Sequence, residues 1–124
     1  NKMPSREEIL ACKWLPDEEL LIYSETYTNT GFQGALNHYR CRFKNKFKTE
    51  LQIFSGCKIL VPTWFISGAS DWGAYQVPGA LKTMERTACD TFCSSHFVDG
   101  AGHWVQQEKP NDVSKLLLKF LKIL

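Results

Sequence analysis

Two polar loops in the second half of the sequence carry residue types that could activate water. Residues 67–73 (SGASDWG) contain the carboxylate of Asp71, and residues 100–104 (GAGHW) contain the imidazole of His103. A carboxylate that accepts a hydrogen bond from one imidazole nitrogen fixes the ring tautomer, so that the other nitrogen can take a proton. Asp71 and His103 are therefore candidate catalytic residues. On spacing alone, Asp71 could instead cap the next helix, and His103 could simply close a glycine turn.

Both loops are expected to follow strands of a parallel sheet. Residues 59–66 (ILVPTWFI) form a short apolar run, typical of a strand buried on both faces, and Pro62 should lie at its beginning because it lacks an N–H. A helix is expected over about 78–87, followed by a second strand near 96–98. Functional groups gather beyond the carboxyl ends of such strands, which lie about 4.8 Å apart. The fold could therefore bring Asp71 within hydrogen-bonding range of His103.

The last helix is expected to begin near Pro110. Its apolar residues recur at i, i+3, i+4 and i+7, and lysines occupy the other face. We expect this stripe to dock against the sheet, in preference to a membrane surface. The second half then reads β-α-β-α, which predicts parallel strands joined by a right-handed crossover. The stripe consists of Val113, Leu116, Leu117, Phe120, Leu121 and Leu124.

The first half is predicted to be helical. One helix is expected from an N-cap at Asp17 to a stop at Gly31, and a second from about Gln33 to the region of Arg42. The basic residues that follow alternate with apolar ones, a period of two that could suggest a strand or a nucleic-acid stripe. No nucleic-acid motif accompanies them, so a solvated connecting segment is favoured and no nucleic-acid partner is expected. The basic residues are Arg40, Arg42, Lys44, Lys46 and Lys48.

Composition is that of a globular protein. Apolar residues make up 44% and the net charge is +2. No apolar stretch approaches the roughly 20 residues of a membrane span, and no secretory leader is visible, so a soluble chain is expected. Five cysteines, with Cys89 and Cys93 as a lone C-x3-C pair, favour reduced thiols in a cytoplasmic protein over a zinc site. We expect neither a metal nor a cofactor.

Three segments resemble the epoxide-hydrolase branch of the α/β-hydrolase superfamily. Residues 102–110 (GHWVQQEKP) are similar to its histidine segment, G-H-W-x-Q-x-E/D-K-P. Residues 31–40 (GFQGALNHYR) are similar to its cap motif, G-x-L-N-x-Y-R, and residues 62–71 (PTWFISGASD) to the strand and loop of its charge-relay acid. The segments occur in family order, and a carboxylate before the histidine is the order of α/β-hydrolases.

The resemblance implies a fold, a domain division and roles for three residues. Residues 1–55 would be a segment of the helical cap, and residues 56–124 the C-terminal part of the α/β core. Asp71 would orient His103, which activates water. Tyr39 would donate a hydrogen bond to the oxygen of a small apolar epoxide, which is opened to a vicinal diol without a cofactor. His38 is interpreted as surface or cap packing.

The family's aspartate nucleophile, on a G-x-D-x-G elbow, has no counterpart in this sequence. We therefore expect the chain to be a fragment whose partner is the remaining N-terminal part of the hydrolase. Two alternatives stay open. One is a haloalkane or haloacid dehalogenase of the same fold, and the other is a truncated, non-catalytic hydrolase-like binding protein.

Overall fold

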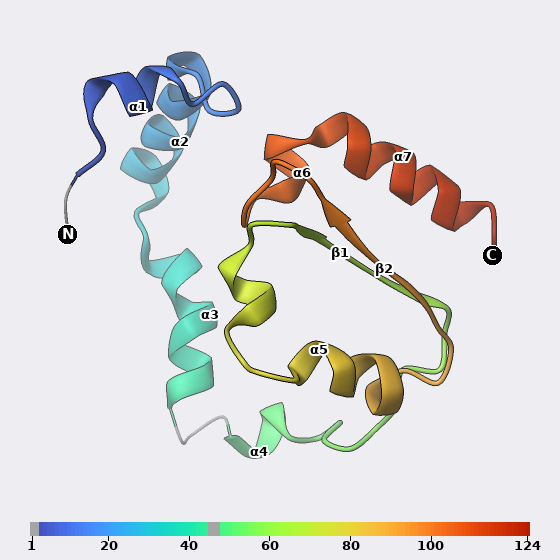
Figure 1. The fold of residues 1–124 in the computed structure, drawn as a ribbon. Coiled ribbons are helices and arrows are strands. Elements are labelled where there is room, and N and C mark those ends of the chain that lie inside the picture. Colours follow the sequence, from blue (N-terminus) through green and yellow to red (C-terminus); the bar gives the residue numbers. More distant parts are fainter. Residues whose placement is uncertain (1–2, 45–47) are drawn as a thin grey trace. The chain divides into compact units, whose positions relative to one another are not determined.

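The computed structural model describes residues 3–44 and 48–124 and divides the chain into two compact units, Asn1–Ser55 and Gly56–Leu124 (Figure 1). The first unit is helical among its described residues. The second combines helices with a two-stranded parallel sheet, so the predicted mixed α/β class is confirmed. Lys46 and Phe47, from the predicted basic connecting segment, lie outside the described residues. Assignment of the two units to cap and core stays a prediction. The helices of the first unit are α1 (Arg6–Leu10), α2 (Asp17–Thr30), α3 (Gln33–Phe43) and α4 (Lys48–Leu51).

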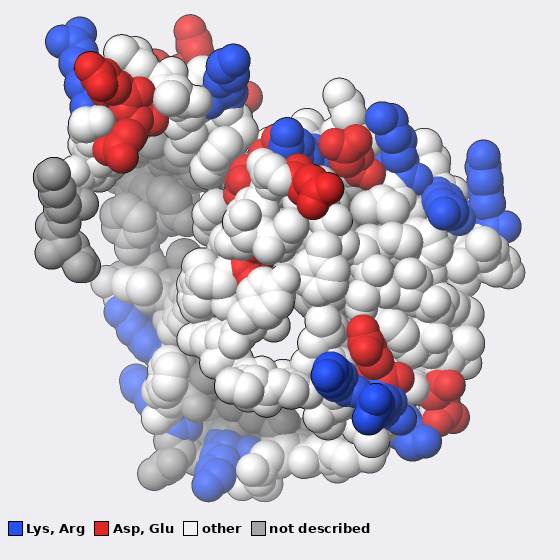
Figure 2. Space-filling model, in the orientation of Figure 1, with Lys and Arg blue, Asp and Glu red and all other residues white. Residues whose placement is uncertain are grey.

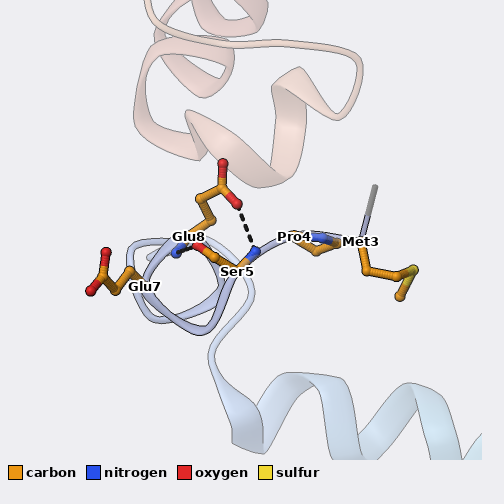
Figure 3. Close-up of a pocket in the computed structure, with 5 residues that line it drawn as sticks. All are labelled: Met3, Pro4, Ser5, Glu7 and Glu8. Atoms are coloured by element: carbon orange, nitrogen blue, oxygen red, sulfur yellow. Dashed lines mark hydrogen bonds between the residues drawn. The ribbon is translucent and has the colours of Figure 1, made fainter. Parts of the chain in front are cut away.

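Helix α1 begins with a capping box. The Ser5 hydroxyl accepts from the Glu8 N–H at 3.2 Å, while the Ser5 N–H donates to the Glu8 carboxylate at 2.7 Å (Figure 3). Each residue thereby satisfies a backbone group that the first helical turn would leave unpaired. The S-x-x-E spacing signals this helix in the sequence, but it was not among the predicted elements. The open hollow around this turn is lined by Met3, Pro4, Ser5, Glu7 and Glu8.

Helices α2 and α3 occupy the predicted ranges. Pro16, in an extended conformation, is the N-cap of α2 without a side-chain hydrogen bond, so the prediction of Asp17 as the cap is wrong by one residue. Asp17 instead supplies negative charge in the first turn, where it suits the helix dipole. Gly31 ends the helix as predicted, with a positive φ of 65° that a glycine adopts without strain.

The two strands of the second unit run in parallel and in register at their carboxyl ends. Ser67 pairs with Phe97, and Gly68 with Val98. The connection between the strands is helical, as the β-α-β prediction requires. In Figure 1 the strands lie between α5 on one side and α7 on the other. The elements are β1 (Thr63–Gly68), the 3-10 turn η2 (Trp72–Tyr75), α5 (Ala80–Thr83), the π-helical turn η3 (Met84–Ala88), β2 (Phe92–Val98), α6 (Val105–Glu108) and α7 (Pro110–Leu121).

The core of this unit forms where β2 ends and α7 begins. Val98, Ala101 and Val105 are buried, and Ile66, Val113 and Leu116 pack against them. Docking of the α7 stripe is thus confirmed for Val113 and Leu116, and Phe120 packs on Trp64 with ring centroids 5.4 Å apart. The prediction is wrong for Leu117, Leu121 and Leu124, which are exposed. Figure 2 shows blue, basic side chains along α7, which in this helix are lysines. The exposed lysines of α7 and its end are Lys115, Lys119 and Lys122.

Several boundaries in the second unit differ from those predicted. Strand β1 begins at Thr63, directly after Pro62, while Ile59 forms only an isolated bridge with Cys89. The prediction of a strand buried on both faces is wrong for residues 63–66, which are half-buried. The single helix expected over 78–87 is two short elements that start after Gly79, whose φ is 81°. No helix of the described residues is long and apolar enough to cross a membrane.

Candidate active site

Asp71 and His103 meet at the carboxyl ends of the two strands. Asp71 is the N-cap of the η2 turn, three residues after β1, and His103 lies in the loop between β2 and α6. The Nδ1 atom of His103 is 2.9 Å from Oδ1 of Asp71. This distance confirms the predicted contact. The two side chains meet because parallel pairing places both loops at one edge of the sheet. The capping role considered as an alternative for Asp71 also occurs, through the same carboxylate.

The Asp71 carboxylate is held by two further donors. The Gly73 N–H donates to Oδ1 at 2.8 Å, and the Ser67 hydroxyl donates to Oδ2 at 3.0 Å. The hydrogen bond from His103 is the main cause that lowers the pKa of Asp71 below its usual range; Gly73 and Ser67 act in the same direction, and burial opposes them. An ionised carboxylate can only accept, so His103 carries its proton on Nδ1. In the neutral imidazole, this leaves the Nε2 lone pair available to accept a proton.

Two tryptophans flank the imidazole. The Trp72 ring stacks on it, with centroids 5.5 Å apart and planes 22° apart, and the Trp104 ring contacts it edge-on at 5.2 Å. The side chain of His103 remains 48% exposed, whereas that of Asp71 is 13% exposed. The carboxylate is thus more shielded than the imidazole, and the exposed imidazole is accessible to a water molecule.

Gly68 allows the two loops to approach each other. A Cβ atom at this position would overlap the carbonyl oxygens of Ala101 and Gly102, immediately before His103. The Ser70 N–H donates to the Ala101 carbonyl at 3.0 Å, which ties the two loops together. Gly68 and Ser67 were not among the predicted site residues. The only sequence signal for them is their place at the end of the apolar run.

Glu108 is a third residue at the site that was not predicted from the sequence. It appears in the histidine segment, and its carboxylate accepts hydrogen bonds from the backbone on both sides of His103. The E/D of the family motif marks the position, but only the folded α6 turn shows what the carboxylate contacts.

Tyr39, the third predicted site residue, lies in α3 of the first unit. The residue is 60% exposed, and its ring contacts that of His38 edge-on, with centroids 5.4 Å apart. The structure brings Asp71 and His103 together, whereas a contribution of Tyr39 to the same site stays a prediction. No group of three His, Cys, Asp or Glu side chains in residues 3–44 and 48–124 is arranged to hold a metal.

Comparison with known sequences shows similarity to epoxide hydrolases. The chain is 38% identical over 111 residues to epoxide hydrolase A of Mycobacterium tuberculosis, covering 87% of this chain and 32% of that protein. It is 34% identical over 106 residues to bifunctional epoxide hydrolase 2 of Mus musculus, covering 86% of this chain and 18% of that protein. No family model matches the chain. The chain thus spans a third or less of the length of these two relatives.

Solved structures give the same result. Potato (Solanum tuberosum) epoxide hydrolase I superposes with a TM-score of 0.78 at 29% identity, over 98% of this chain and 41% of that one. An epoxide hydrolase from an endophytic Streptomyces superposes with a TM-score of 0.80 at 30% identity, over 98% of this chain and 34% of that one. Both the fold of this chain and its sequence therefore match one part of a larger architecture.

Proposed function

This chain is related to the epoxide-hydrolase branch of the α/β-hydrolases and matches a C-terminal portion of those enzymes, and from that premise we propose that it works within a longer hydrolase. This longer enzyme, called here the parent hydrolase, opens a small apolar epoxide to a vicinal diol. The segment supplies Asp71, His103 and Tyr39, and the remaining N-terminal part supplies an aspartate nucleophile. The observation that carries the proposal is the 2.9 Å contact between His103 and Asp71 within a fold similar to epoxide hydrolases.

In the first half-reaction, the nucleophilic carboxylate attacks an epoxide carbon and the ring C–O bond breaks, which leaves an ester. Tyr39 donates a hydrogen bond to the epoxide oxygen and transfers its proton as the alkoxide forms. Nothing in this step needs His103. Tyr39 is 60% exposed on α3, which is consistent with contact to a substrate.

In the second half-reaction, Nε2 of His103 takes a proton from water as the water oxygen bonds to the ester carbonyl carbon. Asp71 stabilises the resulting imidazolium through Nδ1. The tetrahedral intermediate then expels the diol oxygen, which takes the proton back from His103. The regenerated carboxylic acid gives up its proton and the Tyr39 phenolate takes one up, so both groups return to their starting states. The sum is epoxide plus water to diol.

The test is His103→Gln in the parent hydrolase. Gln retains polarity and approximate size but cannot act as the base, so ester hydrolysis should fall by roughly 10²–10⁴-fold while ester formation continues. Intact-protein mass spectrometry after addition of an epoxide such as styrene oxide should show an adduct equal to the mass of the epoxide.

A matched control is Asp90→Asn, which removes a carboxylate of the same unit from an exposed ion pair with Lys58 at 2.7 Å. It should turn over like the wild type and accumulate no adduct. Unchanged turnover in His103→Gln would reject the assigned role. A wild type that releases halide from haloalkanes and leaves epoxides intact would replace the epoxide proposal with the dehalogenase alternative.

The cytoplasmic location also stays a prediction. We propose it because the five cysteines are odd in number and irregularly spaced, a pattern that favours reduced thiols over a disulfide framework. Detection of the parent hydrolase only in a secreted or membrane fraction would contradict it.

A further inference from the structure

We propose that Glu108 is the positioning residue for His103, an inference that rests on the function proposed above. Its Oε2 atom accepts from the Gly102 N–H at 2.7 Å, and its Oε1 atom accepts from the Trp104 N–H at 3.0 Å. These two amides are the immediate neighbours of the histidine. One carboxylate therefore fixes the backbone on both sides of the proposed base.

The two hydrogen bonds that Glu108 accepts are charge-assisted. A carboxylate that accepts from backbone N–H groups forms charge-assisted hydrogen bonds, roughly twice as strong as neutral ones. Glu108 is partly buried, and a Cβ atom on Gly102 would lie only 3.3 Å from Oε1. The loop and the carboxylate are therefore closely packed, so that a small displacement of Glu108 would be transmitted to His103.

The upstream side of the loop is already anchored. Ala101 is 1% exposed, and its carbonyl accepts from the Ser70 N–H of the Asp71 loop. Downstream, the chain enters α6, a single helical turn that ends at Glu108. Glu108 closes this turn back onto the loop, because its carboxylate accepts from the Gly102 N–H six positions earlier. His103 therefore lies between the buried Ala101 and a closed segment that runs from Gly102 to Glu108.

The imidazole itself needs this support. Its side chain is 48% exposed, and its hydrogen bond to Asp71 depends on the direction in which the backbone presents the ring. A displacement of about 1 Å at a catalytic group can reduce a rate by about 10²-fold. Because His103 acts in ester hydrolysis and not in ester formation, loss of Glu108 should slow only the second half-reaction.

Two substitutions in the parent hydrolase test this selectivity. Glu108→Gln retains the length and one acceptor oxygen, so ester hydrolysis should fall by roughly tenfold. Glu108→Ala removes both acceptors, and hydrolysis should fall by about 10²-fold. Single-turnover measurements should show ester formation within about twofold of the wild type in both variants. The matched control is Asp112→Asn, which removes an exposed carboxylate of α7 that pairs with Lys115 at 3.5 Å and should leave both half-reactions unchanged.

A second measurement reports the hydrogen bond between His103 and Asp71 and requires no catalytic turnover. The His103 Nδ1 proton, hydrogen-bonded to Asp71, should give a low-field proton NMR signal in the wild type that disappears in His103→Gln. It should broaden or vanish in Glu108→Gln and persist in Asp112→Asn. If Glu108→Ala does not fold, Glu108→Asp replaces it. Glu108→Asp retains the charge on a shorter side chain, whereas Glu108→Gln retains the length without the charge.

The outcomes separate the two proposals. Hydrolysis within twofold of the wild type and an unchanged Nδ1 signal in Glu108→Gln would overturn the positioning role while the epoxide function stands. Equal slowing of both half-reactions would overturn it too, because it would indicate a general structural effect. If the wild type has no activity on epoxides, the proposed function fails, and the Nδ1 signal alone decides whether Glu108 positions His103.

Discussion

At the scale of single residues, the Asp71 carboxylate is defined by its three hydrogen-bond donors. His103, Gly73 and Ser67 all donate to it, and their atoms lie 2.8–3.0 Å from its oxygens. Each donor stabilises the ionised form, which is why the pKa of Asp71 is lowered although burial opposes the shift. The carboxylate therefore stays charged at any pH at which a histidine could serve as a base.

This lowered pKa predicts a pH-dependent contribution to stability. A carboxyl whose pKa is lower in the folded state stabilises the fold fully above its unfolded value, about 3.9, and the contribution disappears as the pH falls through the folded value. The difference in thermal midpoint between the parent hydrolase and Asp71→Asn should shrink as the pH falls below about 4. The control is Asp90→Asn, because the exposed ion pair between Asp90 and Lys58 contributes only roughly 0–1 kcal/mol to stability. A difference that grows towards acid would contradict the assigned hydrogen bonds.

The sequence predicted the contact between Asp71 and His103 but not the residues that hold the two side chains in place. Asp71 and His103 could be predicted because the topology of parallel strands places their loops at one edge, whatever the details of packing. Ser67, Gly68 and Glu108 could not, because their roles come from atoms that approach one another only in the folded chain. Glu108, for example, contacts amides four and six residues away through the turn of α6.

At the scale of elements, the end of β1 and the histidine loop fit together only without a side chain at residue 68. Gly68→Ala should force the loop carrying Ala101 and Gly102 away from β1, with a cost of roughly 1–3 kcal/mol typical of overpacking. The same shift should separate His103 from Asp71 and reduce ester hydrolysis. The measurements are the thermal midpoint and the single-turnover hydrolysis rate of the parent hydrolase.

Gly34 in α3 provides the control for that substitution. It has no neighbouring atom within 4 Å of an added Cβ and no positive φ, so Gly34→Ala should stabilise the helix by about 0.5 kcal/mol or more. We expect Gly68→Ala to lower the stability and Gly34→Ala to raise it. Small and equal changes in stability would show that the loop tolerates a methyl group at residue 68. That result would contradict the close contact of Gly68 with the carbonyl oxygens of Ala101 and Gly102.

Periodicity predicted the long elements better than the short ones. Helices α2, α3 and α7 were expected from caps and apolar spacing and occur at the expected places. The short elements α5 and η3 lie in the region predicted as one helix, but the sequence did not show their division. The single turn α6 was not predicted, because four residues are too few for a periodic pattern. Strand β1 was predicted too early because apolar character continues through residues 59–62, while Pro62 cannot donate to a neighbouring strand.

At the scale of the whole molecule, the second unit buries little for its size. Among its described residues, the buried apolar side chains are Cys89, Val98, Ala101 and Val105. Large side chains remain accessible, with Trp72 62% and Leu121 62% exposed. Two strands also make a sheet that is marginal by itself. These features are consistent with a segment that matches between a third and two-fifths of the solved epoxide hydrolases it superposes on.

Our last prediction compares the 124-residue chain by itself with the same residues in the parent hydrolase. Burial stabilises by about 25 cal/mol per Å² of apolar surface, and with so few side chains buried this term should not balance the conformational entropy lost on folding. The isolated chain should therefore unfold without a cooperative thermal transition and bind a hydrophobic dye, whereas in the parent hydrolase the β1 and β2 amides should be protected from hydrogen exchange. Asp71 and His103 would then meet stably only when further strands cover the sheet. A single cooperative transition with a well-dispersed NMR spectrum from the isolated chain would show instead that these 124 residues suffice to build the pair.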